Sequence, residues 1–233
     1  VCRALYVSSC TNGYFHNLTL TNSLSGVAAW ELCTDNVIAY NTVSNAGTAD
    51  KFGDGIYTSG STRMSILFNH VSDFTRIGIV TEASGVTKSR DALIMGNFCT
   101  NGHDATLTEF NAGIWVENTN SARVHSNRCT NLYSATHANV PTGIVLGPGT
   151  ASAIDNDSAF IITDNQVEDV DYGFIINPGN DTTDVVISGN TVRAGTVHTS
   201  YLIGMHIATG GTLHLTNNFF GGKRANKRAA GFH

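Results

Sequence analysis

A short pattern of apolar and polar positions recurs along the chain. It opens with glycine, isoleucine, a variable residue and an apolar residue. After a gap it continues with an apolar residue, two variable residues, asparagine, one variable residue and a final apolar residue. Gly113-Ile114-Trp115-Val116, for example, leads to Val124-His125-Ser126-Asn127 and then Cys129. Strand-like units that recur every 20–50 residues or so are typical of a solenoid.

We count eight repeats, of which the first is imperfect because Ala4-Leu5-Tyr6-Val7 replaces its glycine segment. The later repeats begin at Gly26, Gly55, Gly78, Gly113, Gly143, Gly173 and Gly204. Each repeat should hold three short strands: the glycine segment, the segment that ends in asparagine, and the residues after it. The apolar residues alternate as a pleated strand requires. Because equivalent strands stack, the sequence predicts an all-β chain of three parallel sheets wrapped into a coil.

The recurring asparagines have a structural explanation. They are Asn41, Asn69, Asn97, Asn127, Asn165, Asn190 and Asn218. Stacked asparagines at a tight turn can join their side-chain amides by hydrogen bonds along the stack. We therefore interpret them as a ladder and not as catalytic groups.

The glycine segments, the asparagines and their spacing resemble the right-handed parallel β-helix proteins of the pectate-lyase-like superfamily over residues 4–221. The resemblance implies about eight right-handed coils, each of three short strands, with an asparagine ladder. It also implies a polysaccharide partner and an extracellular or virion-surface location, since the superfamily includes polysaccharide lyases, glycoside hydrolases, uronan epimerases and phage tailspikes. We expect residues 1–221 to be one β-helix domain of a longer chain, and residues 222–233 to be a basic C-terminal tail.

The catalytic motifs of this superfamily do not occur in the chain. The polygalacturonase set of Asn-Thr-Asp, Asp-Asp, Gly-His-Gly and Arg-Ile-Lys is absent, and Gly102-His103-Asp104 matches it only in part. The Asp-Pro-His-Glu of alginate epimerases and the Arg-x-Pro-x-x-Arg of pectate lyases are also absent. Site predictions therefore rest on strand geometry.

Outward-facing positions of the first strands bring candidate residues together. If Ile56, Ile79, Ile114 and Ile144 point inward, their neighbours point outward. The first outward column is then Ala28, Tyr57, Val80, Trp115, Val145, Ile175 and His206, and the second is Trp30, Ser59, Glu82, Glu117, Gly147, Asn177 and Ala208.

Glu82 and Glu117 should thus lie on adjacent coils with backbones about 5 Å apart, flanked by Tyr57 and Trp115. Paired carboxyl groups cleave glycosidic bonds, and aromatic rings cover the apolar face of a sugar. The alternative is that both glutamates are simply solvated at strand ends.

Two long connections add further candidates. Residues 44–54 hold Asp50, Lys51 and Asp54, and residues 100–112 hold His103, Asp104 and Glu109. We expect both connections to form the sides of a cleft over the first strands. Asp54 would then lie opposite Glu82 or Glu109, with the cleaved bond between them. The alternative for Asp50 and Asp54 is a turn at Phe52-Gly53-Asp54-Gly55. The predicted catalytic residues are Glu82, Glu117, Asp54, Asp50 and Glu109, and the predicted substrate-binding residues are Tyr57, Trp115, Lys51, Arg76, His103 and Asp104.

Three other functions remain open beside hydrolysis. A lyase needs a base and a cation to neutralise a uronate, for which Lys51, Arg76 or Lys88 with His103 are available. A uronan epimerase needs a Tyr/His pair, and Tyr57 with His103 is the candidate. A non-catalytic module would serve in glycan adhesion or as a structural spike.

Composition and charge exclude several partners and cofactors. Charged residues make up 13% of the chain and the net charge is -5, which argues against a nucleic-acid partner. No apolar run is long enough to cross a membrane. No cofactor is expected. Ca²⁺ is a weak possibility at Asp155-Asn156-Asp157, which lacks a complete loop signature.

The second strands are predicted to be apolar on both faces. Their outward residues are Val37, Leu67, Leu93, Met95, Ile161 and Val186. A stripe of this kind needs a covering partner, and the side-by-side homotrimer of tailspikes fits, as does another segment of the chain.

The five cysteines leave at least one thiol unpaired within the chain. Cys99 and Cys129 occupy the same place in successive repeats and should be stacked core thiols. Cys2, Cys10 and Cys33 allow one disulfide near the N-terminus.

Overall fold

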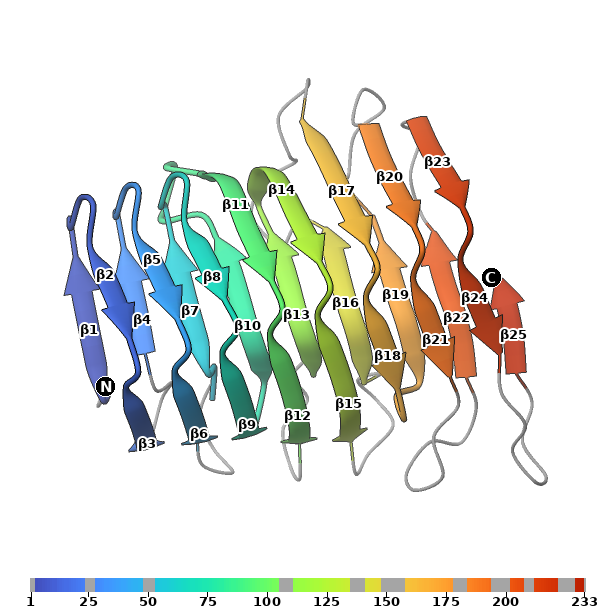
Figure 1. The fold of residues 1–233 in the computed structure, drawn as a ribbon, viewed down its shortest axis with the longest axis horizontal. Coiled ribbons are helices and arrows are strands. Elements are labelled where there is room, and N and C mark those ends of the chain that lie inside the picture. The colour runs from blue at the N-terminus through green and yellow to red at the C-terminus, as the bar shows by residue number, and fades with distance from the viewer. Residues whose placement is uncertain are drawn as a thin grey trace.

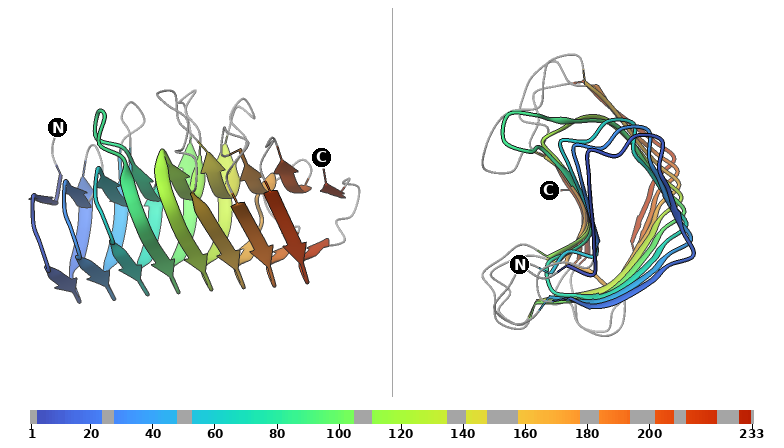
Figure 2. Two further views of the ribbon diagram at one scale, coloured as in Figure 1. Left: turned by 90° about the horizontal axis from the view of Figure 1, so that it is seen from above. Right: turned by 90° about the vertical axis from the view of Figure 1, so that its left-hand side faces the viewer.

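The computed structural model describes residues 3–23, 28–47, 53–104, 111–134, 141–147, 158–177, 184–193, 202–207, 212–221 and 229–232. In these residues all regular secondary structure is β-strand, and 25 strands form three sheets. Every pairing between strands is parallel and joins one coil to the next. The strands progress along one axis from the N-terminus to the C-terminus, and an end-on view shows the sheets enclosing one interior (Figures 1 and 2). The predicted all-β solenoid of eight coils is confirmed.

The strand bounds follow the three predicted segments of each repeat. The first sheet contains β1 (Leu5–Ser8), β4 (Ala28–Glu31), β7 (Ile56–Ser59), β10 (Ile77–Glu82), β13 (Ala112–Glu117), β16 (Thr142–Gly147), β19 (Tyr172–Ile176), β22 (Leu202–Ile207) and β25 (Ala229–Phe232). The second contains β2 (Tyr14–His16), β5 (Val37–Ala39), β8 (Ser65–Leu67), β11 (Ser89–Met95), β14 (Thr119–His125), β17 (Ala159–Thr163), β20 (Asp184–Ser188) and β23 (Thr212–Thr216). The third contains β3 (Thr19–Ser23), β6 (Thr42–Ala46), β9 (His70–Phe74), β12 (Phe98–Asp104), β15 (Arg128–Ser134), β18 (Gln166–Glu168), β21 (Thr191–Arg193) and β24 (Phe219–Gly221).

The glycine at the start of the repeat is required by the close approach of successive coils. A Cβ atom on Gly78 would lie 2.6 Å from the carbonyl oxygen of Gly113, and one on Gly113 would lie 2.8 Å from that of Gly143. The isoleucines that follow, Ile79 and Ile114, pair in register and are completely buried. Glycine therefore lets the coils stack while the next residue fills the core.

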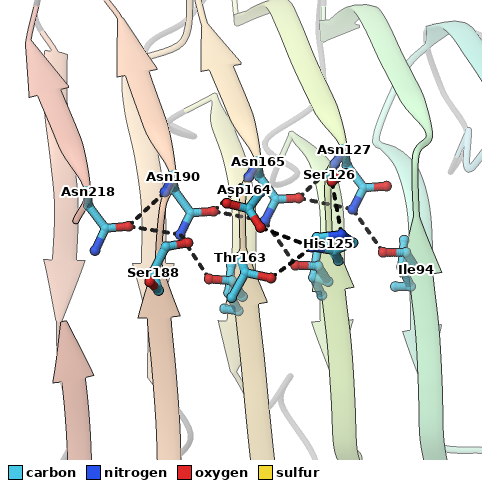
Figure 3. Close-up of polar contacts among 12 residues, drawn as sticks. Ile94, His125, Ser126, Asn127, Thr163, Asp164, Asn165, Ser188, Asn190 and Asn218 are labelled. Carbon is cyan, nitrogen blue, oxygen red and sulfur yellow. Dashed lines mark hydrogen bonds and ion pairs between the residues drawn. The ribbon is translucent and has the colours of Figure 1, made fainter. Parts of the chain in front are cut away.

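The asparagines form the predicted ladder between the second and third sheets. Nδ2 of Asn127 donates to Oδ1 of Asn165 at 3.0 Å, and the same bond joins Asn165 to Asn190 at 2.9 Å (Figure 3). The ladder also runs back to Asn41. Each amide additionally donates to a backbone carbonyl, as Asn127 does to Ile94 at 2.9 Å. The interpretation of these residues as structural is confirmed.

A second polar ladder, which the sequence analysis missed, lies between the first and second sheets. The backbone N–H of Ser61 donates to Oγ of Ser89 at 3.1 Å, and that of Cys33 donates to Oγ of Ser61 at 3.1 Å. Thr119 pairs with Ser89 on the next coil. These buried hydroxyls satisfy backbone donors at a corner where the chain changes direction.

The cysteines behave largely as expected. Cys99 and Cys129 pair in register on β12 and β15, are fully buried and are free thiols. Cys10 and Cys33 are free as well, so they do not form the disulfide that the sequence allowed. Cys2 lies outside the described residues.

The predicted phase of the second repeat was wrong by one residue. Ala28 pairs with Ile56 and Trp30 with Thr58, and both are buried in the core although an outward position was expected. Glu31, paired with Ser59, takes the outward place. Burial of the large indole determines this phase, since it removes more apolar area from water than any alternative residue of the segment.

Strands also occur in segments that were expected to be a tail or a loop. β25 lies within the expected C-terminal tail and pairs with β22, so these four residues continue the first sheet. The domain boundary after residue 221 stays a prediction. β6 extends to Ala46 and β12 to Asp104, so the beginnings of the two expected long connections are strand.

Candidate functional site

Glu82 and Glu117 lie next to each other on the outer side of the first sheet. β10 and β13 pair in register up to Thr81 and Val116, so the glutamate that follows in each strand faces the other. Both side chains are half-buried. The side-by-side position expected from strand geometry is therefore observed.

Tyr57, one coil earlier, holds Glu82 in place. Its hydroxyl donates a hydrogen bond to Oε1 of Glu82. Burial raises the pKa of Tyr57, and the hydrogen bond to Glu82 raises it further. Burial also raises the pKa of Glu82, while the Tyr57 hydroxyl and the charge of Arg76 oppose that rise. These partners favour the ionised form of Glu82, but burial outweighs them and the net effect is a raised pKa.

Glu117 has the opposite electrostatic environment. Burial and the negative charge of Glu82 raise the pKa of Glu117 to about 7. The charge of Arg76 opposes this rise, and the charge of Asp54 adds to it. Near neutral pH the carboxyl group of Glu117 is therefore partly protonated.

Asp54 and Arg76 form a buried ion pair beside the glutamates. Nε and a terminal nitrogen of Arg76 donate to the two carboxylate oxygens of Asp54 at 2.8 and 2.6 Å. The side chains are only 15% and 7% exposed. Burial lowers the pKa of Arg76, but the charge of Asp54 and its hydrogen bonds outweigh burial, and the net effect is a raised pKa. Asp54 thus orients Arg76, whose charge lowers the pKa of both glutamates.

Glu31 is an acidic residue of this face that the sequence analysis missed. It lies in the same outward column as Ser59, Glu82 and Glu117. Arg3 contacts one of its carboxylate oxygens at 3.1 Å and the Tyr6 hydroxyl donates to the other at 2.9 Å. The signal that could have found it is Trp30, because placing the indole in the core moves Glu31 outward.

Trp115 belongs to an apolar patch on the outer side of the same sheet. Ile77, Val80, Ala112 and Val145 are buried there, and the half-buried rings of Tyr57 and Trp115 pack against them with Ile175. The aromatic flank predicted for the glutamates is present, although Trp115 is only partly exposed.

His103 and Asp104 are not brought to the glutamates. They lie on β12 in the third sheet, where His103 packs against Tyr133 with ring centroids 5.3 Å apart. The expected Tyr57–His103 pair is consequently not formed.

The remaining candidates lie outside the described residues. They are Asp50, Lys51, Glu109 and the loop Asp155-Asn156-Asp157. Within the described part of the chain, no group of three or more His, Cys, Asp or Glu side chains could hold a metal ion. No helix long and apolar enough to cross a bilayer occurs in the described ranges. The absence of a cofactor stays a prediction.

Comparison with known proteins finds one family. The model of the right-handed β-helix region matches residues 3–129, which is more than half of the chain. A search of curated protein sequences finds no match.

Two solved structures share the fold at low sequence identity. The tailspike protein gp49 from Pseudomonas phage LKA1 aligns with a TM-score of 0.55 and 13% identity over 99% of this chain and 44% of its own. PfbA, a surface adhesin of Streptococcus pneumoniae, aligns with a TM-score of 0.56 and 11% identity over 95% of this chain and 62% of its own. The chain spans less than two thirds of the length of either protein.

Proposed function

The chain belongs to the right-handed β-helix family, and from this membership and the geometry of the first sheet we propose that it binds a polysaccharide and hydrolyses its glycosidic bonds. The observation that carries the proposal is the pair Glu82 and Glu117, two half-buried carboxyl groups that end adjacent paired strands beside the ring of Tyr57. A tailspike and a surface adhesin have the same fold, which agrees with a glycan partner.

Glu117 is the general acid in this proposal. With a pKa of about 7 it is protonated in the range where many glycosidases work, and it donates its proton to the glycosidic oxygen as the bond to the anomeric carbon breaks. Glu82, whose ionised form Tyr57 and Arg76 favour, either takes a proton from the attacking water or bonds to the anomeric carbon. The first route inverts the anomeric configuration and the second retains it.

The spacing of the two carboxyl groups does not select one route. The two carboxyl groups are about 5 Å apart in retaining enzymes and about 6.5–9.5 Å apart in inverting ones, and two flexible side chains on adjacent coils can adopt either separation when a sugar binds. Identifying the first-formed anomer by NMR distinguishes inversion from retention.

Lyase chemistry has less support from this site. It requires a cation that neutralises the uronate carboxylate. Arg76, a cation beside the glutamates, is buried and already makes two hydrogen bonds to Asp54. We therefore propose hydrolysis ahead of elimination or epimerisation.

The second sheet supports a proposal about assembly. Val37, Leu67, Leu93, Met95, Ile161 and Val186 face outward and are half-buried. We propose that this stripe packs between copies of the chain in a homotrimer, as the resemblance to tailspikes implies, on a virion or as a secreted protein. Light scattering at several concentrations tests it, and a monomer at all of them would contradict it.

The activity is tested by incubating the protein with bacterial capsular, O-antigen and plant polysaccharides. Hydrolysis releases reducing ends without the ultraviolet absorbance of an unsaturated product, whereas a lyase gives both. Glu82→Gln and Glu117→Gln should abolish the release, and Glu168→Gln on β18 serves as the control because that glutamate is exposed on another sheet. Binding of a glycan without any release, in the wild type, would favour a non-catalytic adhesion module instead.

A further inference from the structure

A hollow on the outer face of the third sheet lies apart from the glutamate pair. It is located at the ends of β9, β12 and β15. Its lining includes Asp73, Thr75, Asn101, His103, Asn131 and Tyr133. The glutamates, in contrast, end strands of the first sheet.

Two aromatic rings form one wall of the hollow. His103 and Tyr133 pair in register on adjacent coils, with ring centroids 5.3 Å apart and planes inclined at 33°. Continuing the register of β9 and β12 puts Thr75 before His103 in the same column. Because threonine is much smaller than an aromatic residue, it leaves room on the side of His103 that Tyr133 does not cover.

A short polar ladder forms the second wall. Asp73, Asn101 and Asn131 occupy one position in three successive coils, all with φ near 55°. Nδ2 of Asn101 donates to Oδ1 of Asp73 at 3.3 Å, and Nδ2 of Asn131 donates to Oδ1 of Asn101 at 2.6 Å. The ladder is directional, since every amide donates toward the N-terminal end of the solenoid.

The ladder ends at a buried amide oxygen. Oδ1 of Asn131 is buried and has no hydrogen-bond partner in the described residues. The next coil has Asp169 with the same left-handed φ of 57°. Because Oδ1 of Asn131 is closed to solvent, a ligand in the hollow would meet the ladder at its exposed members, Asp73 and Asn101.

We propose that this hollow is a second carbohydrate site, which binds a neutral sugar unit without cleaving it. The apolar face of the sugar packs on the exposed ring of His103, and sugar hydroxyls donate to the exposed carboxylate of Asp73. Asp73 disfavours an anionic ligand by like charge. A single carboxylate lacks the acid partner that glycoside cleavage requires, so the hollow anchors the polymer while the first sheet acts on it.

The test uses a ring pair of the same sheet as its matched control. His70 and Phe98 are stacked with centroids 5.1 Å apart, but neither lines the hollow. Tyr133→Ala, His103→Ala and Phe98→Ala are made in the Glu117→Gln background, which prevents cleavage, and a glycan array with titration of the bound glycans measures affinity. Circular dichroism confirms that each variant is folded, and Tyr133→Phe tests whether the ring alone suffices.

We expect Tyr133→Ala and His103→Ala to weaken binding about tenfold, whereas Phe98→Ala and Tyr133→Phe leave it unchanged. In the presence of Glu117, both alanine variants should still cleave short oligosaccharides at the wild-type rate. Unchanged affinity in both, an equal loss in Phe98→Ala, or no glycan bound by the parent protein would overturn the site. Tyr133-dependent binding in a protein that cleaves nothing would support this site and contradict the proposed hydrolysis.

Discussion

The hydroxyl of Tyr57 donates a hydrogen bond to the carboxylate of Glu82 on the next coil. Because of this contact, the two neighbouring glutamates, Glu82 and Glu117, differ in how readily they ionise. The Tyr57 hydroxyl lowers the pKa of Glu82, whereas burial and the charge of Glu82 raise the pKa of Glu117 to about 7. This difference in pKa makes Glu117 the general acid of the proposed reaction.

Replacing Glu117 by Gln should remove the proton donor and leave the shape of the face intact. We expect the rate of glycan cleavage to fall by about 10²- to 10⁴-fold, with the binding affinity maintained. Reducing-end assays and titration calorimetry measure the two quantities. A variant that retains the wild-type rate would exclude Glu117 as the acid.

The activity and the stability should both depend on the proton of Glu117. Its pKa of about 7 in the folded protein exceeds the ordinary value of 4.5, so the folded state binds this proton more tightly than the unfolded state. The stability contribution is complete below pH 4.5 or so and is lost as the pH rises through about 7. Cleavage should fall over the same upper range.

We would compare the thermal unfolding of the wild type and of Glu117→Gln at pH values on both sides of 7. The difference between the two proteins gives the contribution of the Glu117 proton to stability. The midpoint of the wild type should decrease more as the pH rises, because glutamine carries no proton to lose. Parallel pH profiles for the two proteins would contradict the raised pKa.

Tyr57→Phe should make Glu82 harder to ionise. Without the hydroxyl the pKa of Glu82 rises further, so the acidic limb of the pH–rate profile should move to higher pH and the rate at mildly acidic pH should fall about tenfold. Tyr6→Phe is the matched control, since its hydroxyl serves Glu31 instead of the glutamate pair. Equal profiles for the two variants would show that the Tyr57 contact has no effect on the reaction.

Asn127→Ala should destabilise the solenoid strongly. The amide of Asn127 donates to Asn165 and Ile94 and accepts from the backbone and side chain of Asn97. Losing it leaves several buried groups unsatisfied, at about 1–3 kcal/mol for each.

Asn218 is the control because it is half-buried and follows Asn190 at the far end of the described ladder. Asn218→Ala should lower the unfolding midpoint much less than Asn127→Ala does. Equal decreases would mean that burial does not determine the strength of the ladder.

Gly113→Ala should disrupt the contact between coils. The new methyl group would lie 2.6 Å from Sγ of Cys129 and 2.8 Å from the carbonyl oxygen of Gly143, so the coils would have to move apart. Gly221→Ala is the control, since its nearest neighbour would be 3.5 Å away. We expect a large decrease in the unfolding midpoint for the first and a negligible one for the second, as measured by circular dichroism.

Much of the fold could be predicted because it depends on a local period. The alternation of apolar residues identifies each strand, and the recurrence of Gly and Asn gives the coil without knowledge of distant contacts. The same period places Glu82 beside Glu117, since both follow their isoleucine by three residues. The second repeat shows the limit of this reasoning, because its glycine at Gly26 precedes the buried Ala28 by one residue too many.

The sequence by itself determined the solenoid, the asparagine ladder and the position of the two glutamates, because neighbouring coils must stack in register to bury their apolar residues. Only the tertiary structure decided the properties that depend on contacts between coils. These are the raised pKa of Glu117, the ion pair between Asp54 and Arg76, and the place of His103 on the third sheet. Burial and Coulomb interactions act through space, and the side chains that exert them come from coils 20–40 residues or so apart in the chain.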